Sequence, residues 1–407
     1  MYVGWDWAAE THDVTVMSDD GQMVVDRWAL THDAKGIDST IERLASHGRP
    51  EDLPVAIETT NGLVVDRLLA AGHPVVPIHP NAFNAARPRW GASRAKSDPG
   101  DSWKLADYLR TDGHRLRRLE PTDPATAEIR ALSRMRDDHV EAKVAATNQL
   151  AALLARHWPG ATSIFARLDS DIALAFLNDY PTPASATRLG EARLKMFCKR
   201  HSYCGRRSPA ELLARLRSAP EPTETISPEI LTELVQAQAR LLRALLHSIA
   251  ELDRALGAAL LEHSKAPLLA PMPRIGEINL AQIIGEIGPI LDRSSDIERA
   301  CAEVGATPVT KESGKGRGVE FRWAANTAAR KAIITYADNS RHASPWAAQL
   351  YNDARARGKR HPHAIRILAR AWMRVIWACW HTNTPYDPTR HGAERRHANT
   401  TNEKSAA

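Results

Sequence analysis

The sequence has only four cysteines and no long apolar stretch. The cysteines, at positions 198, 204, 301 and 379, form no C-x-x-C pair, which argues against a zinc module or a disulfide framework. No apolar run reaches 18 residues, and the first ten residues lack the basic-then-apolar order of a secretion signal. We therefore expect a soluble cytoplasmic protein that does not associate with membranes.

The positive charge of the chain is unevenly distributed. The 407 residues are 43% hydrophobic and 25% charged, an ordinary globular composition for two or three domains, and the net charge is +6. Residues 341–407 hold 12 Lys and Arg against 4 Asp and Glu, and residues 190–207 hold 6 against 1. Clustered positive charge favours binding to a phosphate backbone, although a solvated surface or tail has the same composition.

The first 80 residues alternate between β-prone and helical segments. Three β-prone runs within residues 2–30 are separated by turn-like THD and DDGQ, which predicts an antiparallel meander. A helix, a strand, a second helix and a second strand follow by hydrophobic spacing, at about 33–47, 53–59, 61–72 and 74–80. The order βββαβαβ predicts an α/β domain over residues 1–124, a mixed sheet as in ribonuclease H-like (RuvC-like) folds.

Long helices dominate the next part of the chain, which we delimit as residues 125–268. Apolar spacing predicts one helix over about 125–158 and another over 228–263, the latter roughly 50 Å long at 1.5 Å per residue. We expect an all-α coiled-coil or bundle insertion that either joins subunits or packs on its own domain. Within it, Cys198, His201 and Cys204 have a spacing that is atypical of zinc, so we expect a nucleic-acid-contacting loop there.

The third domain, residues 269–385, is also mainly helical. The segment IGEINLAQIIGEIG predicts half of a helix-hairpin-helix element, whose glycine turns let backbone amides approach phosphate, or else a plain helix ending at Gly288. Helices are predicted over 324–340 and 344–380, the second with tryptophans facing the core and Arg366, Arg370 and Arg374 facing phosphate. Residues 386–407 are expected to form a disordered basic tail.

Two carboxylates lie at strand ends of the first domain. Asp6 stands between Trp5 and Trp7 on a strand that is central in this fold, where an unpaired charge is costly. Glu58 ends the neighbouring strand, and reactive groups gather beyond the carboxyl ends of such strands. The alternatives are an edge strand that exposes Asp6 to solvent and a Glu58 that only caps the next helix.

Asp98 and Asp101 begin a helix three residues apart, as a cap and as a pair on one face. With Asp6 and Glu58 they form an acidic quartet, in which converging carboxylates raise one another's pKa values unless cations neutralise them. Hard divalent ions prefer oxygen ligands, so we expect Mg²⁺, or alternatively Mn²⁺. Two such ions about 3.5–4 Å apart would stabilise the attacking and leaving oxygens of a phosphodiester.

The third domain contains a basic, glycine-rich loop, KESGKGRG. Ser313 lies among Lys311, Lys315, Arg317 and Arg322, and the glycines let the backbone approach a phosphate. We expect these four basic residues to bind nucleic acid. A serine hydroxyl needs a base or a metal ion before it can attack, and no histidine is near it in sequence. A flexible basic loop whose serine matters little is the alternative.

Together these segments resemble a known family. The D…E…D-x-x-D set, the segments VGWDWA, AIETTNGL and KSDPGDSWKLADYL, and the C-terminal IGEINLAQIIGEIG and VGATPVTKESGKGRG are similar to DEDD transposases of the insertion-sequence-110 type. The resemblance covers most of the chain and implies that Asp6, Glu58, Asp98 and Asp101 are the catalytic metal ligands. It implies that Ser313, in P-x-x-x-x-S-G, is the nucleophile. Glu312 beside this serine departs from the family pattern, as does the longer Arg-rich region at about 160–227.

The resemblance also implies a reaction and its partners. A transposase of an insertion sequence would cut and rejoin DNA at element ends and targets through a transient phosphoserine link. Family members are guided by a noncoding bridge RNA that pairs with target and donor DNA, so that the protein reads backbone and shape. A nucleoid-associated dimer or tetramer is expected. The alternatives are a junction-resolving nuclease that uses metal-activated water and an inactive nucleic-acid-binding derivative.

Overall fold

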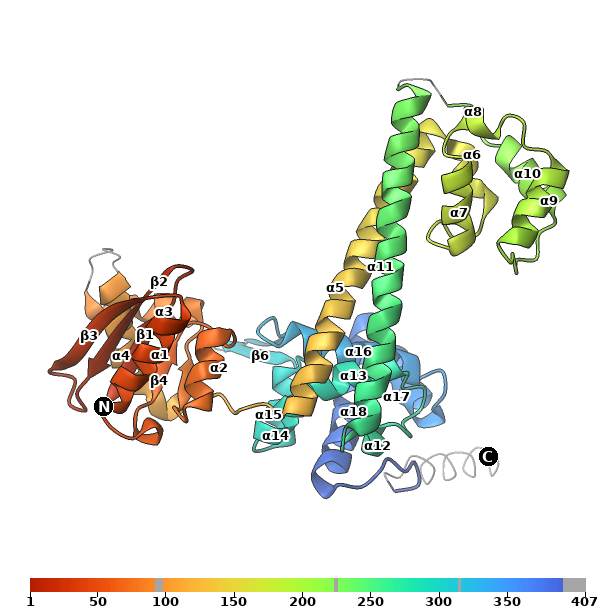
Figure 1. The fold of residues 1–407 in the computed structure, drawn as a ribbon. Coiled ribbons are helices and arrows are strands. Elements are labelled where there is room, and N and C mark those ends of the chain that lie inside the picture. The colour runs from red at the N-terminus through yellow and green to blue at the C-terminus, as the bar shows by residue number, and fades with distance from the viewer. Residues whose placement is uncertain (92–97, 223–225, 314–315, 391–407) are drawn as a thin grey trace, which may run out of the picture. The chain divides into compact units, whose positions relative to one another are not determined.

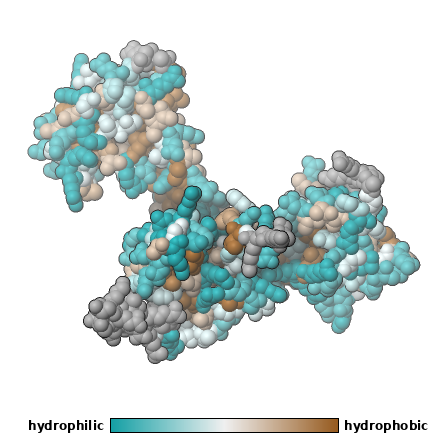
Figure 2. Space-filling model, turned by 180° about the vertical axis from the view of Figure 1, so that it is seen from behind, coloured by the Kyte–Doolittle hydropathy of each residue, from teal (hydrophilic) through white to brown (hydrophobic). Residues whose placement is uncertain are grey.

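The computed structural model describes residues 1–91, 98–222, 226–313 and 316–390 (Figure 1). The side chains of Asp98, Ser313 and Arg317 lie outside the described part. The chain divides into two units, Met1–Pro121 and Thr122–Ala407. The face drawn in Figure 2 is mostly hydrophilic, with hydrophobic side chains in small patches. Among the described residues, no helix combines the length and the apolar character needed to cross a membrane.

The first unit is built on a five-stranded mixed sheet with the order β3-β2-β1-β4-β5. Strands β1, β2 and β3 form an antiparallel meander, and β1 pairs with β4, and β4 with β5, in parallel. The strands are β1 Tyr2–Asp6, β2 Thr11–Met17, β3 Val24–Thr31, β4 Val55–Ile57 and β5 Val75–Pro77. The mixed sheet and the central place of the first strand are thus confirmed, and they fit a ribonuclease H-like domain.

Helices cover both faces of this sheet. On one face, Val3 and Trp5 of β1 share a buried core with α1 and α2. On the other, Ala56 of β4 shares a core with Phe83 of α3 and Leu105 of α4. The elements are α1 Ala34–Ala45, α2 Leu63–Ala70, α3 Pro80–Ala86, α4 Asp98–Asp112, and the short 3₁₀ helices η1 Pro50–Asp52, η2 Arg87–Trp90 and η3 Gly113–Arg115.

Helix α4 lies directly against β1 at Gly4. A Cβ atom at Gly4 would be 1.9 Å from the Ser102 carbonyl oxygen and 2.5 Å from the Ala106 backbone nitrogen, so only glycine allows this approach. Beside it, the buried hydroxyls of Thr15 on β2 and Ser102 on α4 form a hydrogen bond of 2.7 Å. The start of α4 is thereby held over the centre of the sheet.

The second unit is organised by two long antiparallel helices, α5 (Pro124–His157) and α11 (Pro228–Glu262) (Figure 1). The Nε of Arg136 on α5 donates to Asp253 on α11 at 2.5 Å, and Gln238 on α11 donates to the Ala146 carbonyl on α5 at 2.9 Å. The contact that comes earlier on α5 comes later on α11, as antiparallel helices require. The long helices therefore pack on one another within a single chain, and a role in joining subunits stays a prediction.

Five shorter helices form a separate core around one end of this pair. They bury Phe165, Phe176 and Phe197 against α5 and α11. Cys198 is buried in the same cluster, and the His201 ring lies 4.4 Å from that of Phe197, so two residues of the segment expected to form a nucleic-acid-contacting loop pack against this core. The helices are α6 Pro159–Ile164, α7 Asp171–Asp179, α8 Pro183–Ala186, α9 Glu191–Arg200 and α10 Pro209–Arg217.

A larger helical core surrounds the other end of the pair. One two-stranded hairpin projects from it, with Val309 opposite Glu320 and Ser313 opposite Gly316. The elements are α12 Ala266–Leu269, α13 Glu277–Gln282, the π-helix η4 Ile283–Ile287, α14 Gly288–Arg293, α15 Ile297–Glu303, β6 Val309–Ser313, β7 Gly316–Glu320, α16 Thr327–Ser340, α17 Pro345–Ala356 and α18 His361–Thr382.

The expected helix-hairpin-helix element is not confirmed. Helices α13, η4 and α14 follow one another without a turn, and Gly288 begins α14 rather than ending a helix. The glycines serve close packing instead, because a Cβ at Gly285 would lie 3.0 Å from the Cα of Arg130 on α5, and one at Gly288 would lie 2.9 Å from the Trp380 ring. Periodicity alone does not distinguish a glycine turn from a glycine contact.

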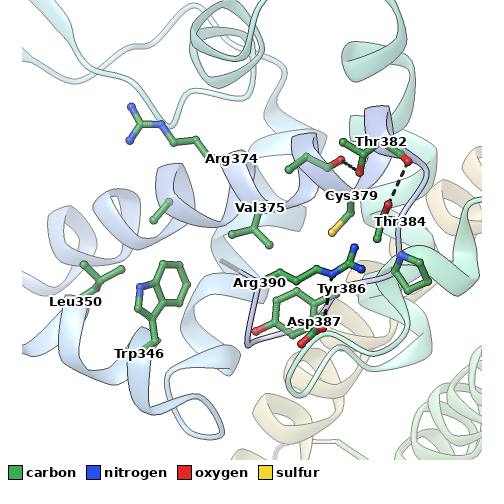
Figure 3. Close-up of a pocket in the computed structure, with 13 residues that line it drawn as sticks. Trp346, Leu350, Arg374, Val375, Cys379, Thr382, Thr384, Tyr386, Asp387 and Arg390 are labelled. Carbon is green, nitrogen blue, oxygen red and sulfur yellow. Dashed lines mark hydrogen bonds and ion pairs between the residues drawn. The ribbon is translucent and has the colours of Figure 1, made fainter. Parts of the chain in front are cut away.

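The segment after α18 folds back on that helix. Tyr386, which was assigned to a disordered tail, is buried, and its backbone nitrogen donates to the Leu268 carbonyl at 2.8 Å. Figure 3 shows Tyr386, Asp387 and Arg390 beside Val375 and Cys379 of α18. Residues 391–407 of the expected tail lie outside the described residues.

Candidate active site

Two of the predicted carboxylates lie side by side at one edge of the sheet. Trp5 of β1 is opposite Ile57 of β4 in a parallel pair, so the next residues, Asp6 and Glu58, are neighbours at the carboxyl ends of both strands. Side chains alternate along a strand, which places Asp6 on the face of Gly4, where α4 packs. Glu58 shares the face of Ala56, which belongs to the same α3–α4 core.

A third carboxylate, Asp13, stands on the other side of Asp6. Asp13 of β2 is the cross-strand partner of Asp6 in the antiparallel pair, and the two side chains therefore project from the same face of the sheet. Sequence reasoning missed this residue. The sequence contained the information needed to find it. DVTV alternates as a strand does, and pairing it with the first strand as an antiparallel hairpin brings Asp13 opposite Asp6.

Asp101 on α4 is buried and makes strong contacts with two basic side chains. Its carboxylate accepts two hydrogen bonds from the Arg87 guanidinium, at 2.6 and 2.9 Å, and one from the Lys104 ammonium at 2.9 Å. The residue is 2% exposed. Burial acts to raise the pKa of Asp101, but the hydrogen bonds and charges of Arg87 and Lys104 outweigh it, so the pKa is lowered and the carboxylate stays ionised.

Arg87 is influenced by the negative charges of several carboxylates of the site. The pKa of Arg87 is raised, first by its hydrogen bonds to Asp101 and further by the negative charges of Asp101, Glu58 and Asp6. All three predicted acids whose side chains the structure describes therefore act on one guanidinium. Arg87 also lies over the Phe83 ring at 4.9 Å. It was not among the residues predicted for the site.

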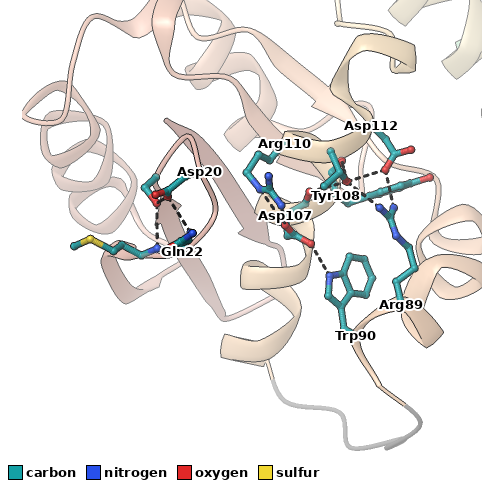
Figure 4. Close-up of polar contacts among 11 residues, drawn as sticks. Asp20, Gln22, Arg89, Trp90, Asp107, Tyr108, Arg110 and Asp112 are labelled. Atoms are coloured by element: carbon teal, nitrogen blue, oxygen red, sulfur yellow. Dashed lines mark hydrogen bonds and ion pairs between the residues drawn. The ribbon is translucent and has the colours of Figure 1, made fainter.

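A polar network fixes the short helix η2 that carries Arg87 (Figure 4). The Trp90 indole donates to Asp107 on α4 at 2.7 Å, and Arg89 donates to Asp112 at 2.6 Å. Asp107 also accepts from Arg110, one turn further along α4. Because η2 is anchored to α4 at several points, the Arg87 side chain is held beside Asp101.

The donor set fits a hard divalent cation. Asp98 is the first residue of α4, three positions before Asp101, although its side chain lies outside the described residues. Carboxylate oxygens are the ligands that Mg²⁺ prefers. Among the described residues, no three acidic, histidine or cysteine side chains are placed to hold a metal ion. Since Arg87 and Lys104 occupy both oxygens of Asp101, a metal ion would have to compete with them.

Ser313, the predicted nucleophile, ends strand β6 next to the hairpin turn. Of the predicted nucleic-acid-binding residues, Lys311 pairs with Glu320 across the hairpin at 2.7 Å. Arg322 donates to the Thr307 carbonyl at 3.0 Å and thus fixes the base of the hairpin. Lys315 and the Arg317 side chain lie outside the described residues.

Comparison with known proteins places the chain in a family. A family model described as "Transposase" matches residues 3–159, and one described as "Transposase IS116/IS110/IS902 family" matches residues 266–352. The mini-circle putative transposase for IS117 of Streptomyces coelicolor is 31% identical over 96% of both chains. The chain belongs to the IS110 family of transposases. It is also 28% identical to an insertion element IS110 protein of Streptomyces coelicolor, over 72% of both chains, and 24% identical to an insertion element IS900 protein of Mycobacterium paratuberculosis, over 95% of this chain and 97% of that protein.

The two family matches cover different parts of the IS110-type chain. The first match contains the acidic residues and Arg87, and the second contains the Ser313 hairpin. Helices α7 to α11 lie outside both matches. As a transposase, the protein is an enzyme that cleaves and transfers DNA strands.

Proposed function

We propose that this transposase cuts and rejoins DNA through the hydroxyl of Ser313, assisted by divalent metal ions that Asp6, Glu58, Asp98 and Asp101 hold. The observation that carries the metal part is geometric: Asp6 and Glu58 end neighbouring strands, on the face of the sheet where helix α4, which carries Asp101, packs. The serine part is supported by the position of Ser313 at a hairpin turn within the second family match.

The proposed reaction conserves the phosphodiester. The Ser313 Oγ forms a bond to phosphorus while the bond from phosphorus to a deoxyribose oxygen breaks. The serine hydroxyl loses its proton, and the leaving oxygen gains one. A hydroxyl of another strand then attacks the phosphoserine and releases the serine. Bound Mg²⁺ would stabilise negative charge on the phosphate and promote deprotonation of the hydroxyl. One bond is exchanged for an equivalent one, so rejoining needs no nucleotide energy source.

We also propose that a noncoding bridge RNA guides the enzyme and that it acts as a dimer or tetramer, since recombination requires at least two strand exchanges. Helix α9 supports an RNA-binding surface. Its apolar residues Leu194 and Phe197 are buried, whereas Lys195, Lys199 and Arg200 are exposed on the opposite side. An exposed basic face suits recognition of a phosphate backbone by charge and shape.

The test compares Ser313→Ala, Asp6→Ala and a matched control, Glu312→Gln, in strand cleavage with Mg²⁺. We expect the first two variants to lose cleavage by at least about 10³-fold, as losing a catalytic group does, and the control to retain it. A covalent protein–DNA product on a denaturing gel should require Ser313. If Ser313→Ala still cleaves while Asp6→Ala does not, the enzyme is instead a nuclease that uses metal-activated water. If all variants behave alike, the catalytic assignment is wrong.

A further inference from the structure

The base of the Ser313 hairpin and helix α18 together line a cavity of about 480 Å³. We call it the α18 groove. Three arginines of α18 and residues at both ends of the hairpin line it, among them Pro308, Phe321, Arg322, Arg366, Arg370 and Arg374. The groove lies wholly within the second unit, and neither the metal-binding proposal nor the serine chemistry uses it.

The arginines of the groove form a row along one face of α18. Arg366, Arg370 and Arg374 are four residues apart, so they rise about 6 Å per step and span about 12 Å. The opposite face, with Leu368 and Trp372, is buried in the core. In Figure 3 the Arg374 guanidinium points away from Tyr386, and the same arginine lines the α18 groove. One phosphate strand advances about 3.4 Å per nucleotide along a duplex axis, so the row has the length of three to four nucleotides.

The groove carries more positive charge than its own acids neutralise. Arg370 and Arg374 share one carboxylate, that of Glu298, at 2.5 and 2.8 Å. Arg366 has no acidic partner within ion-pair distance among the described residues; its guanidinium lies 5.0 Å from the Phe321 ring centroid. Arg330 lies 4.6 Å from the same ring. Burial, followed by the charge of Arg330, lowers the pKa of Arg366, which means that this cation lacks a counter-ion.

An exposed aromatic side chain stands beside the charged row. Trp323 is 81% exposed, and its ring meets that of Phe321 edge-on at 4.8 Å. A large exposed indole has no structural use in a core, but bases stack on such surfaces. A row of arginines with too few acidic partners, next to an exposed aromatic ring, is the combination found where proteins follow a nucleic-acid strand.

We propose that the α18 groove binds the backbone of a DNA strand, with a phosphate at Arg366 and a base against Trp323. The choice of DNA rests on the proposed function, in which Ser313 attacks a DNA phosphate. Ser313 lies at the tip of the β6–β7 hairpin, and the base of the same hairpin lines the groove. Each strand has five residues and spans about 16 Å, or roughly five nucleotide steps. The groove thus binds DNA several nucleotides from the phosphate that Ser313 attacks.

The experiment measures binding of fluorescein-labelled DNA and RNA of one sequence, about 20 nucleotides long, to the full chain by fluorescence anisotropy between 50 and 200 mM salt. All proteins carry Ser313→Ala, so that no chemistry intervenes. The variants are Arg366→Gln, Trp323→Ala and Glu298→Gln. Arg357→Gln, an exposed arginine at the end of α17, is the control for charge loss alone. Unfolding temperatures verify that each variant is folded, and Arg366→Lys keeps the charge.

Removal of one phosphate contact should reduce the slope of log K against log salt by about 0.7–0.9, and we expect Arg366→Gln to weaken DNA binding five- to tenfold. Arg366→Lys should restore most of the slope. Trp323→Ala should weaken binding about tenfold, within the range for one stacked base. Glu298→Gln frees Arg370 and Arg374 and should tighten binding several-fold.

Three results would overturn the proposal. In the first, Arg366→Gln and Trp323→Ala bind DNA as tightly as the control Arg357→Gln. In the second, these two variants lose affinity for RNA but not for DNA. In the third, Glu298→Gln binds DNA more weakly than the protein without that substitution. These results are independent of the serine test. A groove that fails here leaves Ser313 cleavage intact as a proposal, whereas loss of the serine mechanism leaves measured DNA binding by the groove in place.

Discussion

Replacing Arg87 with glutamine is the most informative single change at the acidic site. In the structure, Arg87 gives Asp101 two charge-assisted hydrogen bonds and feels the charges of Asp6 and Glu58. If the same carboxylates bind Mg²⁺, the arginine and the metal ion compete for Asp101. Arg87→Gln should therefore make the metal-free protein less stable and its Mg²⁺ binding tighter, two effects of opposite direction.

The magnitudes follow from burial and partners. Removing one partner of a buried ion pair lowers the free energy of unfolding by about 3–5 kcal/mol. Here Lys104 remains on Asp101, and the Arg87 side chain is 27% exposed, so solvent screening reduces the loss to about 2 kcal/mol. In Arg87→Gln, Mg²⁺ no longer has to displace the guanidinium from Asp101, which makes its binding more favourable by about 1–2 kcal/mol. The gain is smaller than the full ion-pair energy because a displaced guanidinium in the wild-type protein forms hydrogen bonds with water instead. This gain corresponds to roughly five- to thirtyfold tighter binding.

The assay is a Mg²⁺ titration of the full chain by calorimetry, with the unfolding temperature followed at each concentration. Binding to the folded state alone raises stability by RT ln(1 + [Mg²⁺]/Kd), so the two measurements must agree. Arg43→Gln is the matched control, since Arg43 of α1 makes the same kind of two-bond ion pair in this unit, but with Asp26 of β3. It should destabilise without changing Kd. Unchanged or weaker Mg²⁺ binding by Arg87→Gln would refute the competition.

Two further predictions concern the stability of the first unit. Gly4→Ala places a Cβ 1.9 Å from the Ser102 carbonyl oxygen and should cost about 3 kcal/mol in urea unfolding; Gly190→Ala, with open space around it, should cost far less, and equal losses would contradict the packing argument. Burial and the charge of His32 lower the pKa of His12 from 6.5 to about 4. Between these two pH values the unfolded chain binds a proton at His12 that the folded chain does not, so stability should fall as the pH drops from about 6.5 to 4. His12→Gln should reduce this pH dependence of the urea midpoint. A wild-type midpoint that does not change over this pH range would contradict the prediction.

The sheet and the pairing of Asp6 with Glu58 could be predicted because both follow from local periodicity. Strand alternation and the βαβ pattern determine which residues end neighbouring strands, and the central place of β1 follows from the meander. Long helices such as α5 can be predicted equally well, since their apolar spacing persists over many turns. In these elements, local preference and tertiary packing agree.

Arg87 and Arg322 could not be placed in this way. Nothing near Arg87 in the sequence marks it as a partner of Asp101, fourteen residues away, because the contact arises from how η2 docks on α4. The prediction that Arg322 binds nucleic acid stays a prediction, and the sequence did not indicate that its Nε donates to the Thr307 carbonyl. Long side chains reach several partners, so their roles are settled by tertiary contacts rather than by composition.

The charge balance of the acidic site bears on how many metal ions it can hold. Arg87 and Lys104 already occupy both oxygens of Asp101, one of the proposed ligands. A second ion would add positive charge beside these two cations unless Arg87 withdraws or a phosphate enters, and like charges at short range repel. We therefore expect the calorimetric titration to give about one Mg²⁺ per chain without DNA and a higher stoichiometry for Arg87→Gln. Two ions bound to the wild-type protein alone would mean that Arg87 leaves the site readily.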